Sequence, residues 1–193
     1  SGPRPGPLRR HAARSEEPSA VWVLDVGRET IQRLTFEGVG YGPIWSPDGR
    51  QLAFTRPTKG RQSLWTMRTD APGSERLQLE LPGIYNTPVD WTPDGRGIVY
   101  RMQGTETQQD IMLAVLADSA RQRPLLATRF NELHGTISRD GRWIAYLSDE
   151  TGRLELYVRA FPALEQQTRV SQSGAWADPM MASRIGRPLW SRD

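Results

Sequence analysis

The hexapeptide WSPDGR at residues 45–50 recurs as WTPDGR at residues 91–96 and as ISRDGR at residues 137–142, and its first four positions return as WSRD at residues 190–193. The four aspartates of this motif are separated by 46, 46 and 53 residues. A repeat of twenty to fifty residues is typical of proteins built from similar structural units placed side by side. The motif therefore divides the chain into repeating units, of which the last has an insertion.

Each copy of the motif has the residues of a tight turn between two strands. Proline fixes one backbone dihedral angle, the aspartate side chain accepts hydrogen bonds from the amide groups that follow it, and glycine adopts the positive φ that closes the turn. In the third copy Arg139 replaces the proline. We assign structural turn roles to Asp48, Gly49, Asp94, Gly95, Asp140, Gly141 and Asp193.

Short strands are expected on both sides of every turn and twice more in each unit. The expected strands are residues 43–46, 51–55, 63–68 and 76–79, then 89–92, 97–102, 111–116 and 124–127, then 135–138, 143–147, 154–159 and 167–170, with 21–26 and 31–36 as the last two strands of an earlier unit. No stretch shows the sustained 3.6-residue period of an amphipathic helix. Four strands in each unit predict an all-β fold: a partial β-propeller of about three complete four-stranded blades plus parts of two flanking blades. A β-solenoid is the alternative, but its repeats are usually shorter.

Aromatic residues stand at constant positions in the units. A tryptophan precedes the turn in three copies, and Ile137 replaces it in the third. One aromatic per blade at a constant position suits packing between blades, although tryptophans could also line a binding surface. We assign blade packing to Trp45, Trp91, Trp190, Phe54, Tyr100 and Tyr146.

The two ends of the chain differ from its middle. Residues 1–20 are rich in proline and arginine and nearly lack bulky apolar side chains, so we expect a disordered linker there and a propeller over residues 21–193, with blades starting near 43, 88, 135 and 188. The chain begins with Ser1 and ends inside the recurring motif. We therefore expect a segment of a longer protein.

The overall composition excludes several classes of function. A net charge of +3 without runs of like charge does not indicate nucleic-acid binding, and the absence of cysteine excludes disulfides and thiolate chemistry. The longest apolar stretch is too short to span a membrane. The cellular compartment stays open.

Reactive side chains are few. The two histidines are His11 and His134, and no G-x-S-x-G motif or protein-kinase motif accompanies them. The turn aspartates lie one per blade, too far apart to converge on a metal ion, so we expect no catalytic, cofactor or metal site. As possible binding residues we single out His134, just before a strand, and Trp176, in the irregular stretch 171–187.

Laid out in this way, the repeats resemble those of TolB-like, WD-like bacterial propellers over about residues 20–193. The resemblance lies in PIWSPDGRQLAFTR (43–56), PVDWTPDGRGIVYRM (88–102), TISRDGRWIAYLSDETGRLELYVRAFP (136–162) and PLWSRD (188–193). Residues 123–162 are also similar to propellers attached to bacterial serine/threonine protein kinases. This second resemblance implies a six-bladed ring in the intact protein, with a sensing or docking role beside a covalently attached effector domain.

These observations leave two hypotheses for function. The first is a non-catalytic module that binds a protein or peptide, probes no nucleic acid and belongs to a larger bacterial signalling protein such as a serine/threonine kinase. The second is the substrate-screening propeller of a prolyl-oligopeptidase-type serine peptidase whose catalytic domain lies outside this chain. The second hypothesis requires a G-x-S-x-G motif elsewhere in the protein.

Overall fold

The computed structural model describes residues 20–36, 38, 40–82, 85–103, 109–116, 121–175 and 188–191. These residues form fourteen β-strands and no helix, which confirms the expected all-β fold. The predicted linker lies outside the described residues except for residue 20, and Trp176 and Asp193 also lie outside them.

Twelve of the strands form three antiparallel sheets of four strands each, which are the blades of a partial propeller. Blade 1 contains β3 (Tyr41–Trp45), β4 (Gln51–Thr58), β5 (Arg61–Arg68) and β6 (Arg76–Leu81). Blade 2 contains β7 (Asn86–Trp91), β8 (Gly97–Met102), β9 (Asp110–Val115) and β10 (Arg121–Leu126). Blade 3 contains β11 (Glu132–Ile137), β12 (Trp143–Ser148), β13 (Glu155–Ala160) and β14 (Thr168–Arg169). Ahead of blade 1, β1 (Trp22–Asp25) and β2 (Thr30–Arg33) form a two-stranded sheet.

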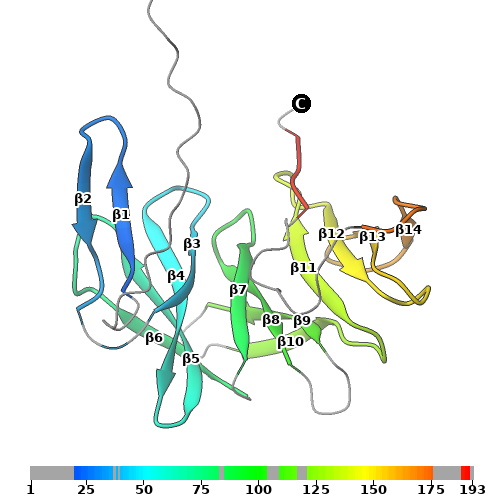
Figure 1. Cartoon of the computed structure of the whole chain (residues 1–193), viewed down its shortest axis with the longest axis horizontal. Helices are drawn as coiled ribbons and strands as arrows, with labels where there is room; N and C mark the ends of the chain where they lie inside the picture. The colour runs from blue at the N-terminus through cyan, green and yellow to red at the C-terminus, as the bar shows by residue number, and fades with distance from the viewer. Residues whose placement is uncertain are drawn as a thin grey trace, which may run out of the picture.

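The blades stand side by side, with their first strands adjacent. Figure 1 shows β3, β7 and β11 in succession through the middle of the molecule, and β7 contacts both of the others. In each blade the remaining strands follow outward in chain order. The three Asp-Gly turns, which join the first and second strands of each blade, consequently lie at the same end of the molecule, called the turn end below.

Each hydrophobic core lies between two neighbouring sheets. Tyr100 is fully buried between blades 1 and 2, and Tyr146 stacks on Tyr157 between blades 2 and 3 with ring centroids 5.7 Å apart. A third core joins the β1–β2 sheet to blade 1 through Val21, Leu34, Leu52, Phe54 and Met67. The apolar residue after each turn thus holds one blade against the next.

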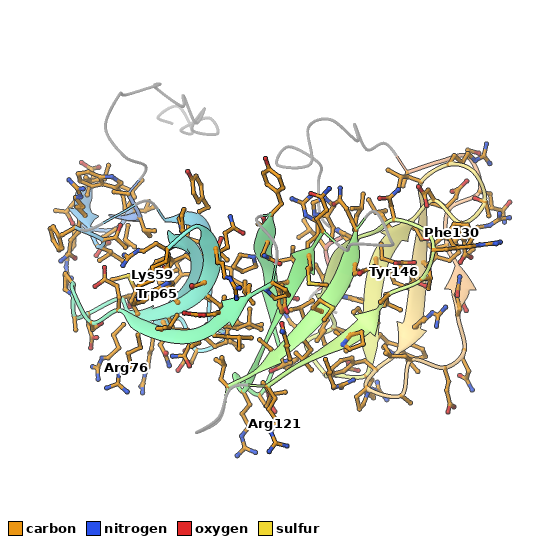
Figure 2. All side chains as sticks on the ribbon, turned by 90° about the horizontal axis from the view of Figure 1, so that it is seen from below. Lys59, Trp65, Arg76, Arg121, Phe130 and Tyr146 are labelled. Atoms are coloured by element: carbon orange, nitrogen blue, oxygen red, sulfur yellow. The ribbon has the colours of Figure 1, made fainter. Side chains whose placement is uncertain are left out.

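The outer strands are protected against pairing with other chains. Figure 2 shows Arg76 and Arg121, at the starts of β6 and β10, pointing away from the sheets. Strand β10 also contains Arg123 and Pro124. Charged side chains and proline on an edge strand disfavour the addition of a further strand.

The first strand of each blade begins two or three residues earlier than the sequence pattern indicates. These strands start at residues 41, 86 and 132 instead of 43, 89 and 135. A shift of register interrupts the pairing of each, and Gly42 and His134 adopt positive φ values of 59° and 55° at two of these bulges. A bulge breaks the two-residue alternation by which a strand is recognised, so the pattern indicates strands that are too short.

Candidate functional site

The Asp-Gly turns share one hydrogen-bond arrangement. Asp48 Oδ1 accepts from Ser46 Oγ at 2.6 Å and from Arg50 N at 3.0 Å. Thr92 with Asp94, and Ser138 with Asp140, repeat the hydroxyl bond at 2.5 Å. The glycines Gly49, Gly95 and Gly141 each have φ of 70°. The hydroxyl at the first position of the turn was missed in the sequence analysis, although a serine or threonine stands two residues before every motif aspartate.

These hydrogen bonds also explain the acidity of the turn carboxyls. The bond from Ser46 lowers the pKa of Asp48, and the bond from Thr92 lowers that of Asp94. For Asp140 the bond from Ser138, joined by one from Arg142 Nε at 2.6 Å, lowers the pKa to about 2. The carboxylates are therefore charged and engaged in the turn at neutral pH.

The tryptophan position links one blade to the next. Trp91 Nε1 donates to the Ile44 carbonyl oxygen of blade 1 at 3.4 Å, and Trp190 Nε1 donates to the Thr136 carbonyl oxygen of blade 3 at 3.2 Å. Between blades 2 and 3, where Ile137 replaces the tryptophan, its main-chain N–H donates to Asp90 Oδ2 at 2.9 Å. In every case the partner lies one residue before the tryptophan position of the preceding blade.

Trp45 differs from the packing role expected for it. Its side chain is 52% exposed, whereas Trp91 is 3% exposed and Trp190 is half-buried. The reason is the neighbour: the sheet ahead of blade 1 has only β1 and β2 among the described strands, with no first strand to receive the Trp45 indole. Phe54, Tyr100 and Tyr146, in contrast, are all buried.

His134 lies at the bulge of β11 and is 8% exposed. Its Nε2 atom has no hydrogen-bond partner. Burial, with a further contribution from the positive charge of Arg101, lowers the pKa of His134 to about 4. The imidazole is therefore neutral at pH 7 and lies within the fold, not on an open surface.

A groove of about 360 Å³ opens at the turn end between blades 2 and 3. Leu113 and Val115 of β9 form part of its lining, and Phe161, which follows β13, faces them from blade 3. The turns of both blades contribute the remaining wall, including Asp94 and Arg96. Apolar surface and two opposite charges thus meet in one depression.

The groove arises where blade 2 departs from the repeat. Gly97 pairs with Val115 across the sheet, and the equivalent pair in blade 1 is Gln51 with Arg68. Two long polar side chains are thus replaced by a hydrogen atom and a valine. A Cβ atom at Gly97 would lie 2.9 Å from Leu113 Cδ1, so the glycine also lets Leu113 pack against the main chain.

The charges at the rim of the groove are not equivalent. Arg142 is held by Asp140, with Nε and Oδ2 2.6 Å apart. Arg96 is exposed, and the structure gives its guanidinium no hydrogen bond or ion pair within the described part of the chain. The Thr92 hydroxyl donates to Asp94 and accepts from Gly97 N at 2.8 Å. The groove can therefore take an apolar side chain and offer a free cation beside it, but its one hydroxyl is already engaged.

Two further searches concern other kinds of site. Within the described ranges, no group of three or more histidine, aspartate or glutamate side chains is arranged to hold a metal ion. Among the same residues there is no helix with the length and apolarity needed to cross a membrane.

Comparison with known proteins places the chain in a family. The sequence model of the TolB beta propeller domain matches residues 10–185, and a protein TolB homolog of Chlorobium luteolum is 33% identical over 132 residues. That match covers 68% of this chain and 29% of the relative, so the chain spans less than a third of the length of that relative.

Solved structures share the fold. Putative TolB from Agrobacterium tumefaciens superposes with a TM-score of 0.65 at 19% identity, over 77% of this chain and 53% of that one. Prolyl oligopeptidase B from Galerina marginata superposes with a TM-score of 0.61 at 15% identity, over 86% of this chain and 25% of that one. With its repeated turns, its four-stranded blades and a family match over most of its length, this chain belongs to the TolB beta propeller domain family.

Proposed function

We propose that this chain is a non-catalytic propeller module that binds a protein or peptide partner in the groove between blades 2 and 3. The observation that carries the proposal is the local departure from the repeat: Gly97, Leu113 and Val115 form an apolar depression where blade 1 has long polar side chains. A repeat position that departs from its copies in just this way is more simply explained by a ligand than by folding, because the buried core does not need it.

The size and chemistry of the groove suit a peptide. Ligand pockets are typically about 300 to 1,000 Å³ and combine apolar walls with a few polar groups that fix orientation. A groove of about 360 Å³ accommodates one large apolar side chain. Arg96 and the Asp94 carboxylate at the rim offer a donor and an acceptor to the main chain of the same segment.

Selection from a random peptide library displayed on phage tests this proposal. Peptides selected on the immobilised chain are expected to share a large apolar residue and to bind in solution with a measurable dissociation constant. Val115→Arg, which introduces the residue that blade 1 has at this place, is expected to weaken binding at least about tenfold, because a charged side chain fills the apolar floor. Val115 is exposed, so the change leaves the core intact.

The matched control is Gln51→Gly, which removes the side chain at the equivalent position of blade 1. It is expected to leave peptide affinity unchanged. Peptides that bind Val115→Arg as tightly as the unchanged protein would refute the groove as their site.

The domain attached to this module is a separate part of the proposal. Residues 123–162 resemble propellers of bacterial serine/threonine kinases, and we propose a signalling protein of that kind as the context. The superposition with prolyl oligopeptidase B over 86% of the chain favours the second candidate, a propeller that screens peptides for a peptidase. The flanking coding sequence distinguishes them: kinase motifs support the first, and a G-x-S-x-G motif with later aspartate and histidine supports the second.

A further inference from the structure

We propose that this chain associates head to tail with a second copy of itself, and that the Trp45 indole of one copy donates to the Leu189 carbonyl oxygen of the next. The surface involved is the open face, defined as the exposed side of β1–β2 (Trp22, Leu24 and Ile31) together with Trp45. This surface is separate from the groove between blades 2 and 3, so the inference goes beyond the proposed function.

The β1–β2 sheet has one covered side and one uncovered side. Val23 packs against the core that joins this sheet to blade 1. The opposite side presents Trp22, Leu24 and Ile31, which are 53%, 51% and 67% exposed, and Leu24 lies directly across from Ile31. An apolar sheet face of this kind marks an interaction surface. In the rest of the chain, the corresponding side of each blade is covered by a neighbouring blade.

The contact that is missing at the open face is known from the other blades. Trp91 and Trp190 each donate an indole N–H to a main-chain carbonyl of the preceding first strand, at the residue before the tryptophan position. Trp45 occupies the same position in blade 1, is half exposed, and makes no such bond within the described residues. The open face therefore continues an interface that the chain already builds, and its natural occupant is another first strand.

The acceptor follows by elimination. Ile44 O receives Trp91, Thr136 O receives Trp190, and Asp90 receives the Ile137 N–H through its side chain. The remaining equivalent position is Leu189, which precedes Trp190 and is 81% exposed.

The strand around Leu189 is itself held in place. Its neighbour Pro188 accepts a hydrogen bond from Thr136 Oγ1 at 3.2 Å, so residues 188–191 sit on blade 3 as the start of a further first strand. If this strand of one copy lies before Trp45 of the next, blade 3 of the first copy faces the apolar side of β1–β2. One docking geometry thus covers both parts of the open face. The outer strands do not compete for this contact, because Arg76, Arg121 and Pro124 protect their edges.

The contact joins two different surfaces and is therefore heterologous. Such contacts build rings or open chains and do not stop at a dimer unless one surface is blocked. Sedimentation of the whole chain is accordingly expected to show an average mass that rises with concentration beyond that of a dimer.

Two variants that each block one surface test the geometry. Trp45→Ala removes the donor, and Leu189→Asp places a charge beside the acceptor; both residues are exposed, so both variants are expected to fold and to remain monomeric alone. Mixed together, they retain one intact donor surface and one intact acceptor surface, and they are expected to form a 1:1 dimer and nothing larger. Loss of the aromatic anchor is expected to weaken association by about tenfold or more.

Trp143→Ala is the matched control, since Trp143 is also exposed but lies on β12 of blade 3 at a different repeat position. It is expected to associate like the unchanged protein, as is Val115→Arg, which separates this inference from the groove. A monomer at every concentration would overturn the proposal. So would self-association of Leu189→Asp alone, which indicates contact between two open faces, or failure of the two blocked variants to pair.

Discussion

The interface between blades 1 and 2 and the interface between blades 2 and 3 are built from the same repeat positions but end in different surfaces. Both bury a tyrosine after the turn, Tyr100 in one and Tyr146 in the other. At the turn end, blade 1 has Gln51 and Arg68 where blade 2 has Gly97 and Val115, and the groove lies beside the second pair. The comparison teaches that the buried positions of the repeat maintain the propeller, while the turn-end positions are free to form a binding site.

The strongest test of this comparison removes the two equivalent tyrosines one at a time. Tyr100→Ala and Tyr146→Ala are each expected to lower the free energy of unfolding by about 3 to 5 kcal/mol, the range for buried aromatic side chains. Urea unfolding with linear extrapolation measures both. A loss at one interface several times that at the other would contradict the view that the two cores are equivalent.

The link between blades 2 and 3 offers a sharper contrast. Asp90→Ala removes the carboxylate that accepts from Ile137 N, and the expected loss of unfolding free energy is about 1.5 to 3 kcal/mol, as for a hydrogen bond to a charged group. Asp90→Asn keeps an oxygen acceptor and is expected to recover most of the loss. If the asparagine variant is as unstable as the alanine variant, the hydrogen bond to Ile137 is not the source of the effect.

The bulge of blade 3 adds a pH dependence that blade 1, with Gly42 at the equivalent position, does not have. The folded pKa of His134 is about 4, below the ordinary value of 6.5, so its contribution is fully present above pH 6.5. As the pH falls from 6.5 to 4, the unfolded chain takes up a proton that the folded chain does not, and stability is lost. Below pH 4 this loss stops.

His134→Gln is expected to abolish that part of the pH dependence, measured as the urea midpoint at a series of pH values. Burial raises the pKa of Glu132, which changes stability in the opposite direction above pH 4.5, and it does so in both proteins. The difference between the two proteins therefore isolates the histidine. Parallel pH profiles would show that His134 titrates normally.

The smallest effect is expected at the turns, where all the blades agree. Ser138→Ala removes the hydroxyl that donates to Asp140 Oδ1, so the pKa of Asp140 is expected to rise from about 2 toward its ordinary value of 3.8. Titration followed by NMR of the side-chain carboxyl measures it. Ser46→Ala is expected to raise the pKa of Asp48 in the same direction, and an unchanged pKa in either variant would contradict the role given to the hydroxyl.

The propeller could be predicted from sequence because its turns depend on local chemistry. An aspartate that accepts from the amide two residues later, followed by a glycine with positive φ, forms the same turn wherever it occurs. The burial of Trp45 could not be predicted in the same way. It depends on whether another strand lies beside it, which is a property of the neighbouring sheet and not of the motif.

The groove was missed for a related reason. It depends on the side chain that Gly97 lacks, and on the proximity of Leu113 and Phe161 from two different blades. The signal was nonetheless present in the repeat, since Gly97 stands in the column that holds Gln51 and Trp143. Comparing the repeats position by position for departures, and not only for agreement, would have pointed to it.

A crystal structure of the chain with a selected peptide tests the central claim most directly. The account predicts that a large apolar side chain of the peptide lies between Leu113 and Phe161, with Arg96 or Asp94 bonded to the peptide main chain. A peptide bound elsewhere on the propeller, with the groove between blades 2 and 3 empty, would contradict it.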